Sequence, residues 1–355
     1  MKLSRPLSKN ESNLIKGVAI LMIIFHNYFH IIPPSPGENQ FAFDSLNFDR
    51  FKQLLIADPL SIIRYSFSYF GHYGVQLFIF ISGYGLYISS KNKEISYFSF
   101  LGQRIKKLYP TLLIIVFFLM IAIPIWEQKI NLSTIKSLLL KLTLLFNFIP
   151  GEAMSVTGPF WFFSLIVQLY IIFPLLAYST KKFGSVSVLL IGAVSLVITI
   201  FFNNYFDSPD VSFYFLFIGQ LPVFCLGIFF ASKRVIHLST NAIIVAIIIF
   251  SLGNINEIFW YFSFPAFTIF MLAFFPGIFS ALGKRKNLYS FLLYSGSISL
   301  YLFAVHGIAR FPFEFISEKY DNALITSTLS LVYLAGTFFL AWLTGLFDKK
   351  VQAVV

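Results

Sequence analysis

The residues best placed for chemistry are Lys16 and His26, which both lie in the first long apolar stretch, residues 13–32. Ionisable side chains in a membrane-spanning helix cost about 2.5–3.5 kcal/mol each on insertion scales, so they are candidates for a function. Ten helical positions correspond to about 15 Å along the axis. We therefore expect Lys16 near one membrane face. His26 should lie past the midplane, where its imidazole could take a proton from an acceptor hydroxyl.

His26 also has simpler interpretations. A histidine inside a helix bundle is as often a hydrogen-bonded core residue as a base. His30 lies one turn further on the same face, and an i,i+4 histidine pair can bind a metal ion. The sequence offers no HExxH motif and no evident acidic partner there, so we expect no metal site. Whether His26 or His30 is the base stays open.

A second stretch, residues 71–84, reads G-x-x-G-V-x-x-F-x-x-x-S-G-Y. Small residues such as Ser82 and Gly83 in a spanning helix usually allow close helix packing. The alternative is that Ser82 and Gly83 line a substrate channel. The complete pattern is more specific than any one of its residues.

A basic pair, Arg104 and Lys107, precedes Tyr109-Pro110 at the start of a later apolar run. The plain interpretation is a cytoplasmic anchor. The functional interpretation is an anion site near a helix N-terminus, where free N–H groups also favour phosphate. Residues three apart share a helix face, so both side chains could bind one phosphate group.

Two further stretches contain polar and aromatic residues that could contact a substrate. Trp161, Gln168 and Tyr170 lie in the apolar run 159–179. Trp and Tyr are common at membrane interfaces, and they also stack on sugar rings. The last stretch is Gly296-x-x-Ser299, followed by His306, which is a weak signal when taken alone.

The composition indicates a membrane protein. Of the 355 residues, 57% are hydrophobic and only 12% are charged, against about 25% charged in soluble domains. The single cysteine, Cys225, excludes an intrachain disulfide and a cysteine-based metal site. The net charge of +11 is better explained by basic loops than by nucleic-acid binding.

Apolar runs of about 18 or more residues predict an all-α, polytopic bundle of about ten transmembrane helices. We treat residues 1–355 as one membrane-embedded domain with outer loops 33–65 and 127–158 and without an appended soluble domain. The predicted spans are 13–32, 66–90, 107–126, 159–179, 185–202, 211–232, 238–256, 258–282, 289–309 and 323–347. The short run 135–149, interrupted by Lys136 and Lys141, is typical of an interfacial helix.

Charges in the loops predict the orientation of the bundle. Basic residues occur at both ends and in every second loop, whereas opposite loops hold acids such as Asp207, Asp210 and Glu257. Basic loops face the cytoplasm, so we expect both termini there. The basic clusters are Lys2/Arg5/Lys9, Lys91/Lys93/Arg104/Lys106/Lys107, Lys181/Lys182, Lys233/Arg234, Lys284/Arg285/Lys286 and Lys349/Lys350.

Together these stretches resemble the acyltransferase-3 family of integral-membrane O-acyltransferases. The first helix is similar to one in which a basic residue precedes a histidine. Four later stretches resemble further family motifs, in the same order. They are residues 71–84, Arg104-x-x-Lys107, Trp161 to Pro174, and Gly296-x-x-Ser299 with His306. The matches extend from residue 15 to residue 306.

The sequence departs from the family pattern at two places. Nine residues separate Lys16 from His26, whereas ten are usual in the family, and the usual spacing would place the histidine position at Asn27. Gln168 lies where many relatives carry a carboxylate.

The resemblance implies transfer of an acyl group, commonly acetyl, from cytoplasmic acyl-CoA to a hydroxyl of a glycan or glycolipid. The bias of the composition towards Phe, Ile, Asn and Lys, with no appended domain expected, favours a bacterial plasma membrane. The resemblance also implies His26 as base, Lys16, Arg104 and Lys107 as acyl-CoA ligands, and no bound cofactor. The channel would be lined by Ser82, Gly83, Trp161, Gln168, Tyr170 and His306. One alternative is a glycan exporter or flippase of the same fold, which would need no acyl donor. Another is a sensor or structural protein that retains inactive motifs.

Overall fold

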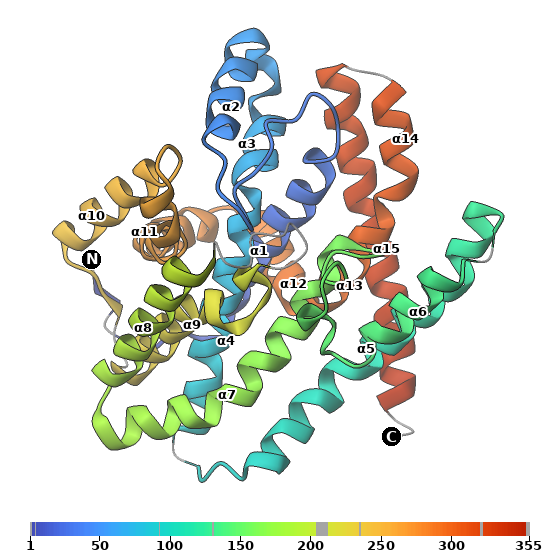
Figure 1. The fold of residues 1–355 in the computed structure, drawn as a ribbon. Helices are drawn as coiled ribbons and strands as arrows, with labels where there is room; N and C mark the ends of the chain where they lie inside the picture. Colours follow the sequence, from blue (N-terminus) through green and yellow to red (C-terminus); the bar gives the residue numbers. More distant parts are fainter. Residues whose placement is uncertain are drawn as a thin grey trace.

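The computed structural model describes residues 2–3, 5–91, 93–129, 131–203, 212–233, 236–319 and 322–352, which are mostly helical (Figure 1). The expected all-helical class is confirmed. Within the described residues, the one strand pairing joins β1 (Lys2–Leu3) to β2 (Ile236–His237). The α-helices are α1 (Lys9–Phe29), α2 (Ser45–Ala57), α3 (Ile62–Phe70), α4 (Gly74–Ser90), α5 (Tyr97–Glu127), α6 (Leu132–Lys141), α7 (Trp161–Phe183), α8 (Val186–Phe202), α9 (Phe217–Lys233), α10 (Thr240–Leu252), α11 (Glu257–Gly283), α12 (Lys286–Ser297), α13 (Ser299–Ala309), α14 (Phe311–Lys319) and α15 (Ala323–Gln352).

Five helices in the described part of the chain are long and apolar enough to cross a membrane, namely α1, α5, α7, α11 and α15. A sixth span is possible if α12 and α13 act together, although they are bent by 85°. Helices α8, α9 and α10 are apolar but shorter. The protein is therefore a helical membrane protein, while the count of about ten spans stays a prediction.

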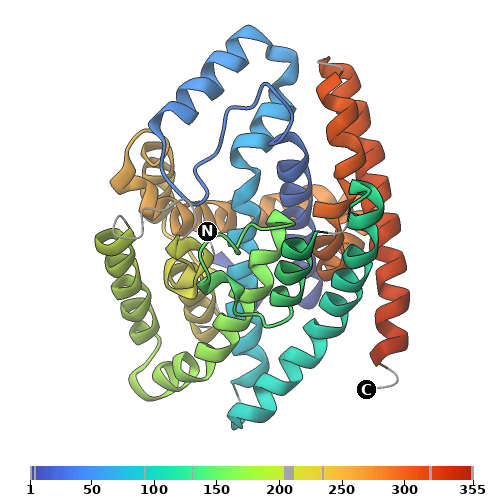
Figure 2. The same cartoon turned by 45° about the vertical axis from the view of Figure 1, so that its right-hand side comes forward.

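Helix α1 lies inside the bundle, next to α3, α4, α12 and α13 (Figures 1 and 2). It begins at a capping box, in which Glu11 N donates to Ser8 Oγ and Ser8 N donates to the Glu11 carboxylate. Such reciprocal bonds satisfy backbone groups that a helix start leaves free. Within α1, Gly17 packs directly on the backbone of Leu292. The central position of α1 explains how Lys16 and His26 become interior residues.

The predicted span 66–90 is not one helix. A 3₁₀ turn, η2 (Gly71–Tyr73), separates α3 from α4. A Cβ built on Gly71 would lie 2.6 Å from His26 Cβ, so only glycine permits this approach to α1. The turn consequently brings His72 beside His26.

The outer faces of several helices are strongly apolar. Phe117 on α5, Leu190 on α8 and Phe339 on α15 are exposed by 68%, 62% and 58%. A soluble protein rarely exposes so many large apolar side chains. These faces fit contact with lipid tails, in agreement with the composition.

Several basic segments lie at one end of the bundle. Lys181 Nζ donates to Lys93 O and Lys91 Nζ donates to Ser232 O, each at 3.1 Å. The end of α4, the start of α5 and the end of α15 lie at the lower end in Figure 1. Asp207, Asp210, Arg234 and Asp321 lie outside the described residues. The cytoplasmic location of the termini remains a prediction.

Candidate functional site

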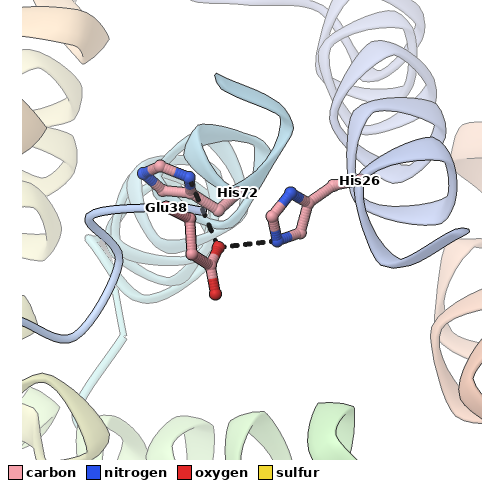
Figure 3. A group of neighbouring side chains, drawn as sticks. All are labelled: His26, Glu38 and His72. Carbon is pink, nitrogen blue, oxygen red and sulfur yellow. Dashed lines mark ion pairs between the residues drawn. The ribbon is translucent and has the colours of Figure 1, made fainter. Parts of the chain in front are cut away.

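Three histidines surround the carboxylate of Glu38, and Figure 3 shows two of them, His26 and His72. His26 Nε2 lies 2.8 Å from Glu38 Oε2, and His72 Nδ1 lies 3.7 Å from the same oxygen. His30 Nε2 lies 3.8 Å from Glu38 Oε1. The cluster combines the end of α1, the loop that follows it and the turn η2.

Backbone carbonyls fix the ring of His26. Its Nδ1 lies 3.0 Å from Ser68 O and 3.2 Å from Phe67 O, at the end of α3. Carbonyl oxygens only accept, so Nδ1 carries the proton in this arrangement. The lone pair of the neutral ring is then on Nε2, the atom that lies beside Glu38. A proton accepted by this nitrogen would lie between His26 and Glu38, whose Nε2 and Oε2 atoms are 2.8 Å apart.

The loop that carries Glu38 is held by three distant side chains. Arg64 donates to Ile32 O at 3.0 Å, Asn47 Nδ2 donates to Glu38 O at 2.9 Å, and Trp260 Nε1 donates to Asn39 O at 2.7 Å. Gly37 precedes Glu38 with φ +80°, a conformation that favours glycine. These contacts bring a loop carboxylate over the end of α1.

Opposing effects determine the charge of Glu38. Burial disfavours the charged carboxylate, but the charges of His26, His30 and His72 outweigh burial and lower its pKa to about 2. Glu38 is therefore ionised at neutral pH.

A cavity of about 180 Å³ adjoins the cluster. Its wall includes Trp161 and Arg310, and the Arg310 guanidinium lies 3.5 Å from Asn27 O and Oδ1. We call it the histidine cavity. It is lined by Ile23, His26, Asn27, His30, Ile31, Glu38, Gln40, His72, Val75, Met154, Gly158, Pro159, Trp161, Phe303 and Arg310.

A second cavity, of about 120 Å³, contains Lys16. We call it the lysine cavity. It is lined by Lys16, Phe78, Ser82, Leu108, Phe162, Phe163, Ile166, Tyr170, Ser299, Leu300 and Phe303.

Phe303 lines both cavities. Its ring packs against Phe162 and Phe163, with centroids 4.9 and 5.9 Å apart. The two cavities are thus neighbours with an aromatic side chain at their boundary.

The other predicted basic residues lie outside both cavities. Arg104 stacks on Phe100, 5.2 Å from the ring centroid, and is close enough to Tyr170 for an electrostatic interaction. Lys107 is exposed on the same helix. Arg104 therefore lies beside the lysine cavity without lining it.

Three residues that were predicted to line a channel make close packing contacts or hydrogen bonds inside the protein. They are Gly83, Gln168 and His306. A Cβ on Gly83 would overlap Phe224 O, so Gly83 permits close contact between α4 and α9. Gln168 is buried and bonds Phe217 N and Ser164 Oγ, at 3.0 and 3.3 Å. His306 is fully buried, and its Nδ1 lies 2.7 Å from Phe303 O. All three were expected to line a channel, and none of them lines either cavity.

The sequence analysis missed Glu38 and His72. The expectation that no acidic side chain lies near the histidine pair was wrong. Glu38 is the one acidic residue between Glu11 and Asp44. This isolated position in the sequence could have marked Glu38 as a candidate partner for the histidines. His72 lies inside the G-x-x-G motif but was given no role.

Comparison with protein families gives one result that bears on function. A family model described as an acyltransferase domain matches residues 9–346. The match covers the cluster, both cavities and nearly all of the helices. Comparisons with curated proteins and with solved structures gave no match.

Proposed function

Because the chain belongs to the acyltransferase-3 family, we propose that this membrane acyltransferase moves an acyl group, commonly acetyl, from acyl-CoA to a glycan hydroxyl. The observation that carries the proposal is the pair of adjoining cavities. One cavity holds a cation and the other holds a histidine beside a carboxylate. A reaction between a thioester and a hydroxyl needs both kinds of environment.

The lysine cavity is the proposed donor side. Lys16 makes no hydrogen bond or ion pair within the described residues, so its ammonium group can meet an anionic or carbonyl oxygen of the donor. Arg104 and Lys107, at the start of α5, are the proposed contacts for CoA phosphates. Ser82 and Tyr170 supply hydroxyl groups in the same cavity.

The histidine cavity is the proposed acceptor side. His26 Nε2 takes the proton of the acceptor hydroxyl as its oxygen attacks the thioester carbonyl. The carboxylate of Glu38, 2.8 Å from the same nitrogen, stabilises the resulting imidazolium by its negative charge. In a catalytic triad, by contrast, the carboxylate bonds the other ring nitrogen. Collapse of the tetrahedral intermediate forms the ester and expels the CoA thiolate, which receives the proton from His26. Trp161 offers an aromatic face to a sugar ring.

The orientation of the bundle supports a cytoplasmic donor and an outer acceptor. The basic loops favour the cytoplasm for the end of the bundle that carries Lys91, Lys93 and Lys181. His26 lies towards the opposite end of α1, about 15 Å beyond Lys16. We propose a bacterial plasma membrane as the location, with surface or lipid-linked glycans as acceptors.

The proposal is tested by mass spectrometry of surface polysaccharide from cells with and without the chain. We expect ester-linked acetyl groups that require the chain and disappear on mild base treatment. Purified protein should also bind acetyl-CoA, and the Lys16→Gln variant should bind it more weakly. A glycan exporter would instead alter the amount of surface glycan without acetylating it. Export without acetyl-CoA binding would overturn the proposal.

A further inference from the structure

We propose that His26, Glu38 and His72 form a binding site for one divalent transition-metal ion such as Zn²⁺, and that the bound ion blocks acyl transfer. Metal binding follows from the geometry of the cluster alone. The block on acyl transfer rests additionally on the proposed role of His26 as base.

The three side chains offer ligand atoms within reach of a single ion. One nitrogen each from His26 and His72 and one oxygen from Glu38 all lie within 4.8 Å of one another. In tetrahedral zinc sites, ligand bonds of about 2.0–2.2 Å place neighbouring ligand atoms roughly 3.3 Å apart. The separations here, 2.8 and 3.7 Å from Glu38 Oε2, bracket that value. Only small side-chain movements are needed.

The polar atoms of the cluster lack the bonds that burial normally demands. Both ring nitrogens of His72 are buried and have no hydrogen-bond partner among the described residues, and the polar neighbours of Glu38 Oε2 are the rings of His26 and His72. The side chain of His72 is 1% exposed. A buried polar group without a partner costs about 1–3 kcal/mol, and one cation would satisfy the oxygen and one nitrogen together.

The ring of His26 is already oriented as a metal ligand. Ligating histidines usually donate their second N–H to a carbonyl or carboxylate, which fixes the tautomer. His26 Nδ1 has this contact with Ser68 O at 3.0 Å, which leaves Nε2 as the ligand atom. Gly71 allows the turn η2, which carries His72, to pack closely on α1, and Gly37 allows the loop that carries Glu38 to pack on Asn47.

Two imidazoles and a carboxylate match the ligand preferences of zinc, which often takes two histidines, a glutamate and one open position. The adjacent histidine cavity, of about 180 Å³, has room for a fourth ligand such as water. His30 Nε2, which lies 3.8 Å from Glu38 Oε1, is an alternative to water as the fourth ligand.

Metal binding and proton transfer would compete for the same lone pair. His26 Nε2 cannot accept a proton while it is bonded to a metal ion. Zinc should therefore inhibit the enzyme, and removal of zinc should restore activity without any covalent change.

The test uses purified full-length protein in detergent, freed of metal by a chelator and carrying no histidine tag. Calorimetric titration with Zn²⁺ should give one ion per chain, and Co²⁺ should give the visible absorption of a tetrahedral site. His72→Gln should weaken zinc binding by about tenfold or more, the scale seen when even outer partners of a metal site are lost. His306→Gln, which replaces another fully buried histidine, should leave zinc binding unchanged.

Absence of stoichiometric zinc binding, or equal affinity in wild type and His72→Gln, would overturn the site. The second measurement is the zinc concentration that halves acetyl transfer, compared between each variant and its own zinc-free rate. His72→Gln should require at least tenfold more zinc. Zinc binding without inhibition would overturn the competition at His26. A chain that binds zinc but never transfers acetyl groups would instead refute the proposed function.

Discussion

Lys16 and His26 lie ten positions apart on α1 but line different cavities, which meet at Phe303. The helix therefore connects a cationic cavity with a cavity that contains a histidine and a carboxylate. A thioester held beside Lys16 would have to pass Phe303 to reach a hydroxyl beside His26. This relationship motivates the first two predictions.

Phe303→Ala should open the boundary between the cavities. We expect hydrolysis of acetyl-CoA in the absence of acceptor to rise several-fold, because water in the histidine cavity would reach the thioester. Phe78→Ala removes the same volume from the lysine cavity alone and should not raise hydrolysis. Each substitution costs about 3–5 kcal/mol if the phenyl ring is well packed, so melting temperatures must confirm folding. Unchanged hydrolysis in folded Phe303→Ala would contradict this boundary role.

Lys16→Gln should mainly weaken donor binding. Hydrogen bonds to charged groups contribute about 1.5–3 kcal/mol, and 1.4 kcal/mol corresponds to a factor of ten. We therefore expect KM for acetyl-CoA to rise about tenfold or more, with a smaller change in kcat. The control is Lys9→Gln, since Lys9 is exposed at the start of the same helix. Equal KM values for the two variants would argue against a donor contact at Lys16.

Gly71→Ala should disturb both stability and activity. A methyl group at Gly71 would lie 2.6 Å from His26 Cβ and 2.7 Å from Met22 O, and backbone atoms cannot yield easily. Overpacking of this kind typically costs about 1–3 kcal/mol and would displace His26.

Gly85→Ala is the matched control for Gly71→Ala, because a Cβ at Gly85 meets nothing within 4 Å. In a helix, this change should be neutral or stabilising by up to about 1 kcal/mol. Thermal unfolding in detergent and acetyl transfer should therefore separate the two variants. Similar losses in both would mean that the contact with α1 is unimportant.

Lys141 provides a pH-dependent prediction for stability. Burial lowers its pKa to about 8, although Glu152 opposes this effect. Its ammonium group bonds Glu152 O and Ser155 Oγ and lies 4.2 Å from the centroid of Phe146. Between about pH 8 and the ordinary pKa of 10.5 the unfolded chain binds more protons at this residue than the folded chain. Folding stability should therefore increase with pH in that window.

The measurement compares melting temperatures of wild type and Lys141→Met from about pH 8 to about pH 10. The wild type should gain stability relative to Lys141→Met as the pH rises. Lys136→Met, on the same helix, should follow the wild type. A wild type that loses stability relative to Lys141→Met over this range would reverse the predicted sign.

Hydropathy alone could predict the helical membrane class, because a long apolar run has few alternatives to a spanning helix. It could not predict that residues 66–90 break at η2, since the break depends on how closely Gly71 packs against α1. It also could not separate α12 from α13, which meet at a bend of 85°. Such breaks depend on tertiary contacts that apolar runs do not encode.

Helical spacing was enough to predict that Lys16 and His26 lie about 15 Å apart along one helix, and the structure places them at different cavities. Glu38 could not be placed this way. Its position depends on hydrogen bonds to a loop without regular periodicity. Asn47 donates to this loop from the next helix, and Arg64 and Trp260 donate to it from more distant parts of the chain. Motif spacing also could not show that Gln168 accepts a hydrogen bond from Phe217 N, or that Gly83 permits close contact between α4 and α9.

The central claim is that His26 is the base for acyl transfer, and the most direct measurement compares acetylation by His26→Ala and His30→Ala. Both proteins should be assayed with acetyl-CoA and a glycan acceptor after equal folding has been shown by thermal unfolding. Loss of a general base should reduce kcat by about 10²–10⁴-fold. We predict this loss for His26→Ala and a much smaller effect for His30→Ala, whose ring is 3.8 Å from Glu38. Acetylation by folded His26→Ala at the wild-type rate would contradict the claim.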